Sequence, residues 1–172
     1  IIHVTINKTA SATHDAAVMA RQMFYDENPN SHMNITVVDS RCYSEGYGYP
    51  VMCADEMIEN GASAAEIIEY LENRFENTEI LLGTFSLKFM KKSGRISAAA
   101  AFAGELMGLR PVILMKHGKT EVLLKARGDK LLIPGLVAKM RERNSNPREY
   151  IVGYTADIDA RDELVAACTE AM

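Results

Sequence analysis

Short aliphatic segments alternate with longer segments of helical period through the first half of this 172-residue chain. Strands are predicted at residues 1–6, 35–38 and 80–83. Helices are predicted from the first polar turn to about Tyr25, around Val51–Ile58, and from Ser63 onward. Parallel strands need long crossover connections, which are usually helices. This order therefore predicts a parallel sheet with helices packed on its faces.

The predicted helices carry apolar residues at helical spacing. The apolar face of the first helix comprises Ala16, Ala17, Met19, Ala20, Met23 and Phe24. In the second helix, which follows Gly46–Pro50, the side chains expected to point inward are Val51, Met52, Met57 and Ile58. Ser63 and Glu66 form a capping-box pattern at the start of the third helix. The residues expected to be buried there are Ile67, Ile68 and Leu71.

The second half of the chain has a different order of elements. A helix over Ser97–Leu106 is followed by a hairpin pattern. That hairpin combines Pro111–Met115, a His117-Gly118 turn and Glu121–Leu124. The last predicted elements are a helix through Leu136, Val137 and Met140, a strand at Tyr150–Tyr154, and a helix from about Ile158.

An α/β fold with two domains follows from these patterns. Residues 1–90 are expected to form a parallel sheet with flanking helices. Residues 91–172 are expected to form a smaller α/β domain with an antiparallel or mixed sheet. Because the first residue is not Met and residues 1–6 already form a strand pattern, we expect an internal piece of a longer protein. The missing parts would be the N-terminal part of the first domain and the C-terminal part of the second.

Composition excludes several classes of protein. A net charge of −4 argues against a broad nucleic-acid-binding surface. No apolar run has the roughly 20 residues of a membrane span, and no signal peptide is visible. Cys42, Cys53 and Cys168 lack a paired spacing, as expected of reduced thiols in a cytoplasmic protein. The four histidines lack the spacing of metal ligands, so no metal site is predicted. No nucleophile is assigned to them, so no catalytic residue is predicted.

The first candidate site lies at Ser11-Ala12-Thr13, between the first strand and its helix. Ligands of open α/β sheets bind at the carboxyl ends of strands, where a helix N-terminus offers free N–H groups. Hydroxyls of Ser11 and Thr13 could therefore help to hold a carboxylate or phosphate. The alternative is that one of them is only the helix N-cap, which Ser and Thr favour in any case.

The second candidate is the basic run Lys91–Ser97, which precedes the small-residue stretch Ala98–Gly104. Arg95 could engage an anionic head group, since a guanidinium fork suits carboxylate and phosphate. The small residues would leave room for an apolar tail, or would simply allow close backbone packing. The alternative for the basic run is a solvated loop that caps the neighbouring helices.

The third candidate is Lys125-Ala126-Arg127-Gly128, at the end of the second hairpin strand. Arg127 could face the same ligand as Arg95. As a surface charge it would need no functional explanation, because exposed ion pairs contribute little to stability.

Taken together, these segments resemble the DegV family of bacterial lipid-binding proteins. In that family a strand leads into a serine-rich turn ending Ser-Gly-Thr, where this chain has Ser11-Ala12-Thr13. The other matching segments are Asp39-Ser40 with Ser44, Gly46 and Gly48; Leu87–Ile96; Arg110–Val112; His117-Gly118; and Lys125–Gly128. The order and spacing match over essentially the whole chain.

The resemblance implies a long-chain fatty acid bound between two domains. It also implies that the protein is the non-catalytic, fatty-acid-binding subunit of a bacterial fatty acid kinase, with no further cofactor. The chain would present the carboxylate to a separate ATP-binding kinase subunit, which makes an acyl phosphate. Ser11, Ala12 and Thr13 would bind the carboxylate, and Arg95 and Arg127 would contact the head group or the kinase. Ile96 and Phe102 are candidates for the acyl pocket.

Two departures from the family pattern affect the same turn. Asn7-Lys8-Thr9-Ala10 replaces the family's Ser-Ser-Gly-Leu, and Ala12 replaces a glycine. Head-group geometry is therefore expected to differ, since Ala is less permissive than Gly of a tight backbone approach. Two other functions stay open at this point: an interaction domain that docks an acidic partner, and an enzyme acting on a small phosphorylated ligand. The expected state is a monomer without membrane insertion.

Overall fold

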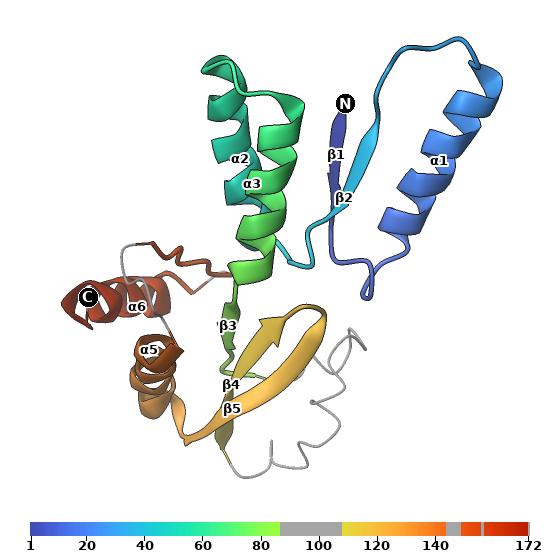
Figure 1. The fold of residues 1–172 in the computed structure, drawn as a ribbon. Coiled ribbons are helices and arrows are strands. Elements are labelled where there is room, and N and C mark those ends of the chain that lie inside the picture. Colours follow the sequence, from blue (N-terminus) through green and yellow to red (C-terminus); the bar gives the residue numbers. More distant parts are fainter. Residues whose placement is uncertain (87–107, 144–148, 156, 172) are drawn as a thin grey trace. The chain divides into compact units, whose positions relative to one another are not determined.

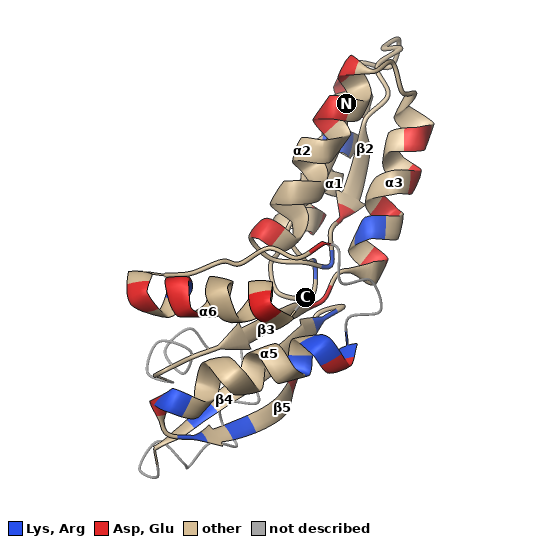
Figure 2. Ribbon diagram, turned by 90° about the vertical axis from the view of Figure 1, so that its left-hand side faces the viewer, with Lys and Arg blue, Asp and Glu red and all other residues tan. Residues whose placement is uncertain are grey.

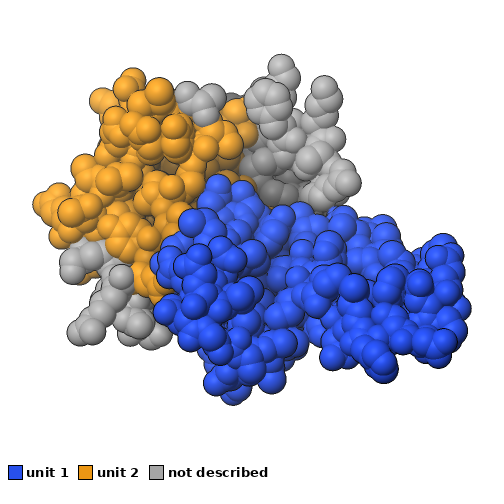
Figure 3. Space-filling view, turned by 90° about the horizontal axis from the view of Figure 1, so that it is seen from above, with its two compact units in different colours: residues 1–80, 116–118 blue, residues 81–115, 119–172 orange. Residues whose placement is uncertain are grey.

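The computed structural model describes residues 1–86, 108–143, 149–155 and 157–171, which are drawn in colour in Figure 1. The chain separates into two compact units (Figure 3). Unit 1 contains residues 1–80 together with 116–118, and unit 2 contains residues 81–115 and 119–172. The predicted boundary between residues 90 and 91 lies outside the described residues and stays a prediction.

Unit 1 is built on a parallel strand pair. β1 (Ile2–Thr5) and β2 (Thr36–Asp39) pair in register from Ile2 opposite Thr36 to Thr5 opposite Asp39. The crossover between them contains α1 (Thr13–Glu27), which ends where Asn28 and Pro29 follow. The predicted strand–helix–strand unit is therefore confirmed, and both strands end at the same edge.

Two further helices supply the core of unit 1. α2 (Glu45–Glu59) and α3 (Ala64–Asn77) lie on the other side of the strands from α1 (Figure 1). The buried cluster consists of Val38, Ala54, Ile67, Leu71 and Phe75. The Ser63–Glu66 capping box is confirmed, since each residue's side chain accepts a hydrogen bond from the other's backbone N–H.

The predicted inward face of α2 is wrong for three of its four residues. Val51, Met52 and Ile58 are 38%, 67% and 57% exposed, whereas Met57 packs against the core. The helix begins earlier than predicted and includes Pro50, so its inward stripe is Tyr47, Pro50, Ala54 and Met57. These positions recur at helical spacing, and the three exposed residues fall on other faces. The apolar face of α1 is also largely uncovered, with Met19 and Met23 exposed.

The third predicted strand exists but belongs to the other sheet. β3 (Ile80–Gly83) pairs with β4 (Leu109–Lys116), which pairs in turn with β5 (Lys119–Arg127). Its expected place beside the first two strands is therefore wrong. A short aliphatic run indicates burial between layers but carries no information about its partner strand. The overall class, an α/β fold with a parallel sheet followed by a separate antiparallel one, is confirmed.

Unit 2 packs two helices beside the hairpin strands. A short 3₁₀ turn (Asp129–Leu131) leads into α5 (Leu132–Arg143), which packs against α6 (Ile158–Ala171) around Ile133, Val137 and Cys168. The predicted strand Tyr150–Tyr154 is wrong: its backbone is irregular, and Tyr150, Ile151 and Tyr154 are exposed. A strand forms only where a neighbour supplies hydrogen bonds, which local sequence does not reveal. The predicted helix 97–106 lies outside the described residues.

Two alanine substitutions test the corrected orientation of the helices in unit 1. Leu71→Ala removes a side chain that is 1% exposed and should lower the free energy of unfolding by about 2–5 kcal/mol. Met52→Ala, which the sequence pattern would have made a core change, should alter it by less than about 0.5 kcal/mol. Urea unfolding followed by circular dichroism measures both values, and similar losses in the two variants would contradict the assigned α2 face.

Candidate functional site

The candidate site lies at the carboxyl ends of the two parallel strands. Thr5 and Asp39 end β1 and β2 side by side, so the segments 6–12 and 40–44 leave the same edge of the sheet. Ligand sites of open α/β sheets are found at this edge. Thr5 is buried, and its hydroxyl donates to the Val38 carbonyl and lies 3.0 Å from Nδ1 of His14.

Asn7 holds the two segments together. It is 1% exposed, and its Nδ2 donates to the Arg41 carbonyl at 3.2 Å and to the Tyr43 hydroxyl at 3.3 Å. Its backbone N–H donates to the Cys42 carbonyl. Its Oδ1 accepts two hydrogen bonds from Thr9, from the backbone N–H and from the hydroxyl, each 2.8 Å long. Every polar atom of this buried amide is used, which is what burial of a polar side chain requires.

Asp39 and Ser40 form hydrogen bonds that stabilise the segment 40–44, which follows β2. Oδ1 of Asp39 accepts hydrogen bonds from the backbone N–H groups of Lys8 and Arg41, at 3.1 and 3.0 Å. The fully buried Ser40 hydroxyl donates to the Cys42 carbonyl and accepts from the Cys42 N–H. Arg41 adopts a positive φ of 54°. The tight turn is therefore stabilised by side chains that replace regular backbone pairing.

The predicted carboxylate-binding residues lie at the start of α1. The Ser11 hydroxyl lies 2.7 Å from the Thr13 hydroxyl and accepts a 3.3 Å hydrogen bond from the Thr13 N–H. Ala12 is the N-cap residue and makes no side-chain cap bond. Neither hydroxyl is therefore the N-cap itself. Their mutual hydrogen bond uses one O–H group, and the other O–H group can turn toward an anion. Binding of a carboxylate by Ser11, Ala12 and Thr13 stays a prediction.

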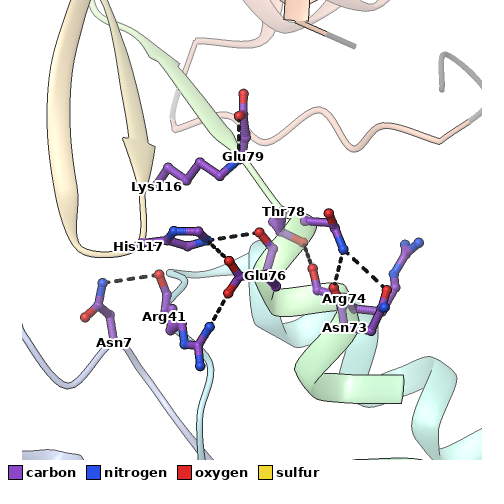
Figure 4. A network of polar contacts seen from close by, with 10 residues as sticks. Asn7, Arg41, Asn73, Arg74, Glu76, Thr78, Glu79, Lys116 and His117 are labelled. Atoms are coloured by element: carbon purple, nitrogen blue, oxygen red, sulfur yellow. Dashed lines mark hydrogen bonds and ion pairs between the residues drawn. The ribbon is translucent and has the colours of Figure 1, made fainter. Parts of the chain in front are cut away.

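The turn between β4 and β5, residues 116–118, belongs to unit 1. Nε2 of His117 lies 2.9 Å from the Glu76 carbonyl oxygen and 3.6 Å from its Oε1 (Figure 4). The Glu76 carboxylate also pairs with Arg41. The Lys116 ammonium is 2.9 Å from Oε1 of Glu79. Sequence reasoning treated His117 only as a turn residue and missed these contacts, because nothing local links it to the end of α3.

A small polar cavity opens beside this loop region. It has a volume of about 170 Å³ and is lined by Lys8, His14, Val37, Val38, Asp39, Arg41, Glu72 and Phe75. Pockets for drug-sized ligands usually measure about 300–1,000 Å³, so this cavity is too small for a long acyl chain. Ser11 and Thr13 do not line it. A second, open hollow in unit 2 carries Asp157 and Asp159, whose charges would repel a carboxylate.

Arg127 lies at the end of β5 and is exposed. Residues 110–143 carry nine Lys or Arg and three Asp or Glu, although the whole chain has a net charge of −4. Much of this positive charge lies on β5 and α5 (Figure 2). Alternation along the strand places Lys119, Lys125 and Arg127 on one face. Arg95, Ile96 and Phe102 lie outside the described residues, so the predicted convergence of Arg95 with Arg127 stays a prediction.

Sequence reasoning missed the most connected residue of the site. The sequence pattern marks Asn7 only as part of a polar turn and as a departure from a family pattern. Its signal in the sequence is its position directly after a buried strand of a parallel pair, where polar residues converge. Within the described ranges, the His, Cys, Asp and Glu side chains form no cluster of three or more that could hold a metal ion. No helix in the described part of the chain is long and apolar enough to cross a bilayer.

The family model described as "Uncharacterised protein, DegV family" matches residues 1–172. Among curated proteins, the chain is similar to a fatty acid-binding protein of Thermotoga maritima, with 28% identity over 163 residues. That match covers 93% of this chain and 54% of the relative. The chain thus spans about half the length of the curated relatives it matches.

The chain is also similar to solved structures of proteins loaded with a fatty acid. A DegV family protein from Eubacterium eligens, loaded with heptadecanoic acid, superposes with a TM-score of 0.83 at 25% identity. The match covers 99% of this chain and 62% of that protein. The fatty acid kinase B3 protein of Streptococcus pneumoniae, loaded with linoleic acid, superposes with a TM-score of 0.71 at 26% identity. That match covers 83% of this chain and 50% of that protein.

The cysteine thiols test the packing of the loop after β2. Burial, with a further contribution from the Asp39 charge, raises the pKa of Cys42 to about 11, and burial also raises the pKa of Cys168. At about pH 8 only about one Cys42 thiol in a thousand is ionised, and the thiolate is the reactive form. Iodoacetamide should therefore modify the half-buried Cys53 and spare Cys42 and Cys168.

Peptide mass spectrometry identifies the labelled cysteine, and unfolding in guanidinium chloride should make all three react. Rapid labelling of Cys42 in the folded protein would contradict the packed loop described above.

Proposed function

The chain belongs to the DegV family, and we propose that it binds a long-chain fatty acid and presents the carboxylate to an ATP-binding kinase subunit. The observation that carries this proposal is the pair of hydroxyls on Ser11 and Thr13, 2.7 Å apart at the N-terminus of α1. A hydroxyl pair with one free O–H donor, beside the positive end of a helix, suits a carboxylate. Relatives that are named or solved as fatty-acid-binding proteins support the choice of ligand.

The energetics favour an acyl ligand over a small anion. Burial of each CH₂ group contributes about 0.8 kcal/mol, so a long tail supplies most of the affinity. A few polar contacts at the carboxyl end are then enough to fix its orientation. In this proposal Ile96 and Phe102 contribute to the acyl pocket, and Ser11, Ala12 and Thr13 hold the carboxylate.

The basic face of β5, formed by Lys119, Lys125 and Arg127, supports a role in presentation. Phosphorylation joins a carboxylate oxygen to the γ-phosphorus of ATP, and ADP leaves as an acyl phosphate forms. Arg127, on the same strand face as Lys119 and Lys125, offers positive charge for a phosphate or for an acidic surface of the kinase. The similarity to the fatty acid kinase B3 protein supports this partner. Arg95 is proposed for the same role.

A matched pair of serine substitutions tests ligand binding. Ser11→Ala should weaken the affinity for heptadecanoate about 10- to 100-fold, the cost of losing a hydrogen bond to a charged group. Ser31→Ala is the control, because Oγ of Ser31 accepts from the N–H two residues later, as Oγ of Ser11 does. Isothermal titration of delipidated native protein, with mass spectrometry of extracted lipid, measures both.

Equal affinities in the two serine variants would contradict the role of Ser11. Absence of fatty acid from the native protein, together with no uptake of added heptadecanoate, would contradict the proposed ligand. It would then favour an interaction domain whose basic face docks an acidic partner.

A pair of arginine substitutions tests presentation separately. Arg127→Gln should leave heptadecanoate affinity within about twofold and lower the rate of acyl-phosphate formation at least about tenfold, because exposed interface charges act mainly on association. Arg141→Gln, the same change at an exposed position on α5, is the control. Hydroxylamine trapping of acyl phosphate, made with the kinase subunit and ATP, measures the rate. Equal rates in both variants would overturn the role of Arg127.

A further inference from the structure

The turn between β4 and β5 lies directly against the loop that leads to Ser11. His117 and Gly118 have φ values of 48° and 76°, so both central residues of this two-residue turn are left-handed. Turns of this kind match the twist of hairpin strands and favour glycine at the second position. A Cβ placed on Gly118 would overlap Oγ1 of Thr9 and lie 3.0 Å from Nδ2 of Asn7. The turn therefore touches the loop at atomic contact.

The atoms that a Cβ on Gly118 would meet take part in the hydrogen bonds that hold the loop between β1 and α1 in place. Oγ1 and the backbone N–H of Thr9 both donate to Oδ1 of Asn7, and the Ala10 N–H donates to the Asn7 carbonyl. Ser11 follows Ala10 directly. A shift of Thr9 would break two of these hydrogen bonds and move the backbone that carries the Ser11 hydroxyl.

The neighbouring residues of the turn fix its position within unit 1. Nε2 of His117 donates to the Glu76 carbonyl, one of the last carbonyls of α3, which have no partner within the helix. The carboxylate of Glu76 pairs with Arg41, whose own carbonyl accepts from Asn7 (Figure 4). The loop is thus held from two directions by a connected set of contacts. Asn would also tolerate the left-handed backbone at position 117, but its side chain is too short to reach Glu76 in the same way.

From this geometry we propose that the turn Lys116–Gly118 is a positioning element for Ser11. Gly118 provides the close approach to Thr9, and His117 holds the turn on the end of α3. Both are positioning residues, since neither is assigned a contact with the ligand. The part of this inference that concerns fatty acid rests on the function proposed above.

A matched pair of glycine substitutions tests the contact without any ligand. Gly118→Ala should speed amide hydrogen exchange of Thr9 and Ala10 at least about tenfold, because local opening becomes easier. Gly61→Ala is the control: its φ is also positive, at 82°, but no atom lies within 4 Å of its Cβ position. It carries the same backbone strain without the contact and should leave the exchange of Thr9 and Ala10 unchanged. Exchange resolved by residue in NMR spectra measures both, and equal rates would overturn the proposal.

A second substitution separates the contact from general loss of folding. Thr9→Ala removes the obstructing Oγ1, so in the Gly118→Ala background it should restore part of the protection at Ala10. His117→Asn keeps a tolerated turn residue and removes the Glu76 contact, and it should also speed exchange at Thr9 and Ala10. No effect of His117→Asn together with no restoration by Thr9→Ala would overturn the proposed roles of both positions.

Heptadecanoate affinity provides the functional measurement. Gly118→Ala should weaken binding at least about fivefold more than Gly61→Ala, because Ser11 is displaced. Faster exchange with unchanged affinity would overturn the positioning role. If the unsubstituted protein takes up no heptadecanoate, the proposed function fails, and the exchange measurements still decide whether the turn orders the loop.

Discussion

The hydrogen bonds of the buried Asn7 side chain join the two loops that leave the parallel strand pair, and the geometry of the candidate site depends on them. Nδ2 reaches the loop after β2 at Arg41 and Tyr43, and Oδ1 organises the loop after β1 through Thr9. A two-stranded sheet cannot by itself determine the path of the segments that leave it. A buried amide whose polar atoms are all hydrogen-bonded can determine that path, because the loss of any of these hydrogen bonds would leave a polar atom unsatisfied in the interior.

The charge around Asn7 differs from the charge of residues 110–143, and the two regions are suited to different roles. Around Asn7, the Asp39 carboxylate accepts from the backbone N–H groups of Lys8 and Arg41, and the Arg41 guanidinium pairs with Glu76. Such pairs set geometry and leave little net attraction for an anion. The stretch 110–143 instead carries excess positive charge in an otherwise acidic chain. Unbalanced charge of this kind acts at longer range and suits encounter with an anionic group or partner.

Much of the fold could be predicted, because local patterns determined it. The strands of unit 1, the α1 crossover and the Ser63–Glu66 box follow from residue period and capping chemistry, and all are present. The wrong predictions concern which elements pair or pack with one another. β3 joins β4, Tyr150–Tyr154 finds no strand to pair with in the described residues, and α2 turns Met52 outward. The first two depend on neighbours that are distant in the chain, and the third depends on where α2 begins.

The sequence by itself determined the strand–helix–strand order of unit 1, which family the chain resembles, and that Ser11 and Thr13 lie at a strand–helix junction. Those properties depend on residues within a few positions of one another. Only the tertiary structure decided that Asn7 is buried, that Thr9 meets Gly118, and that His117 reaches the end of α3. The pairs Asn7–Arg41, His117–Glu76 and Thr9–Gly118 are each at least 34 positions apart in the chain. They form because tertiary packing brings distant segments of the chain together, and no local pattern records that.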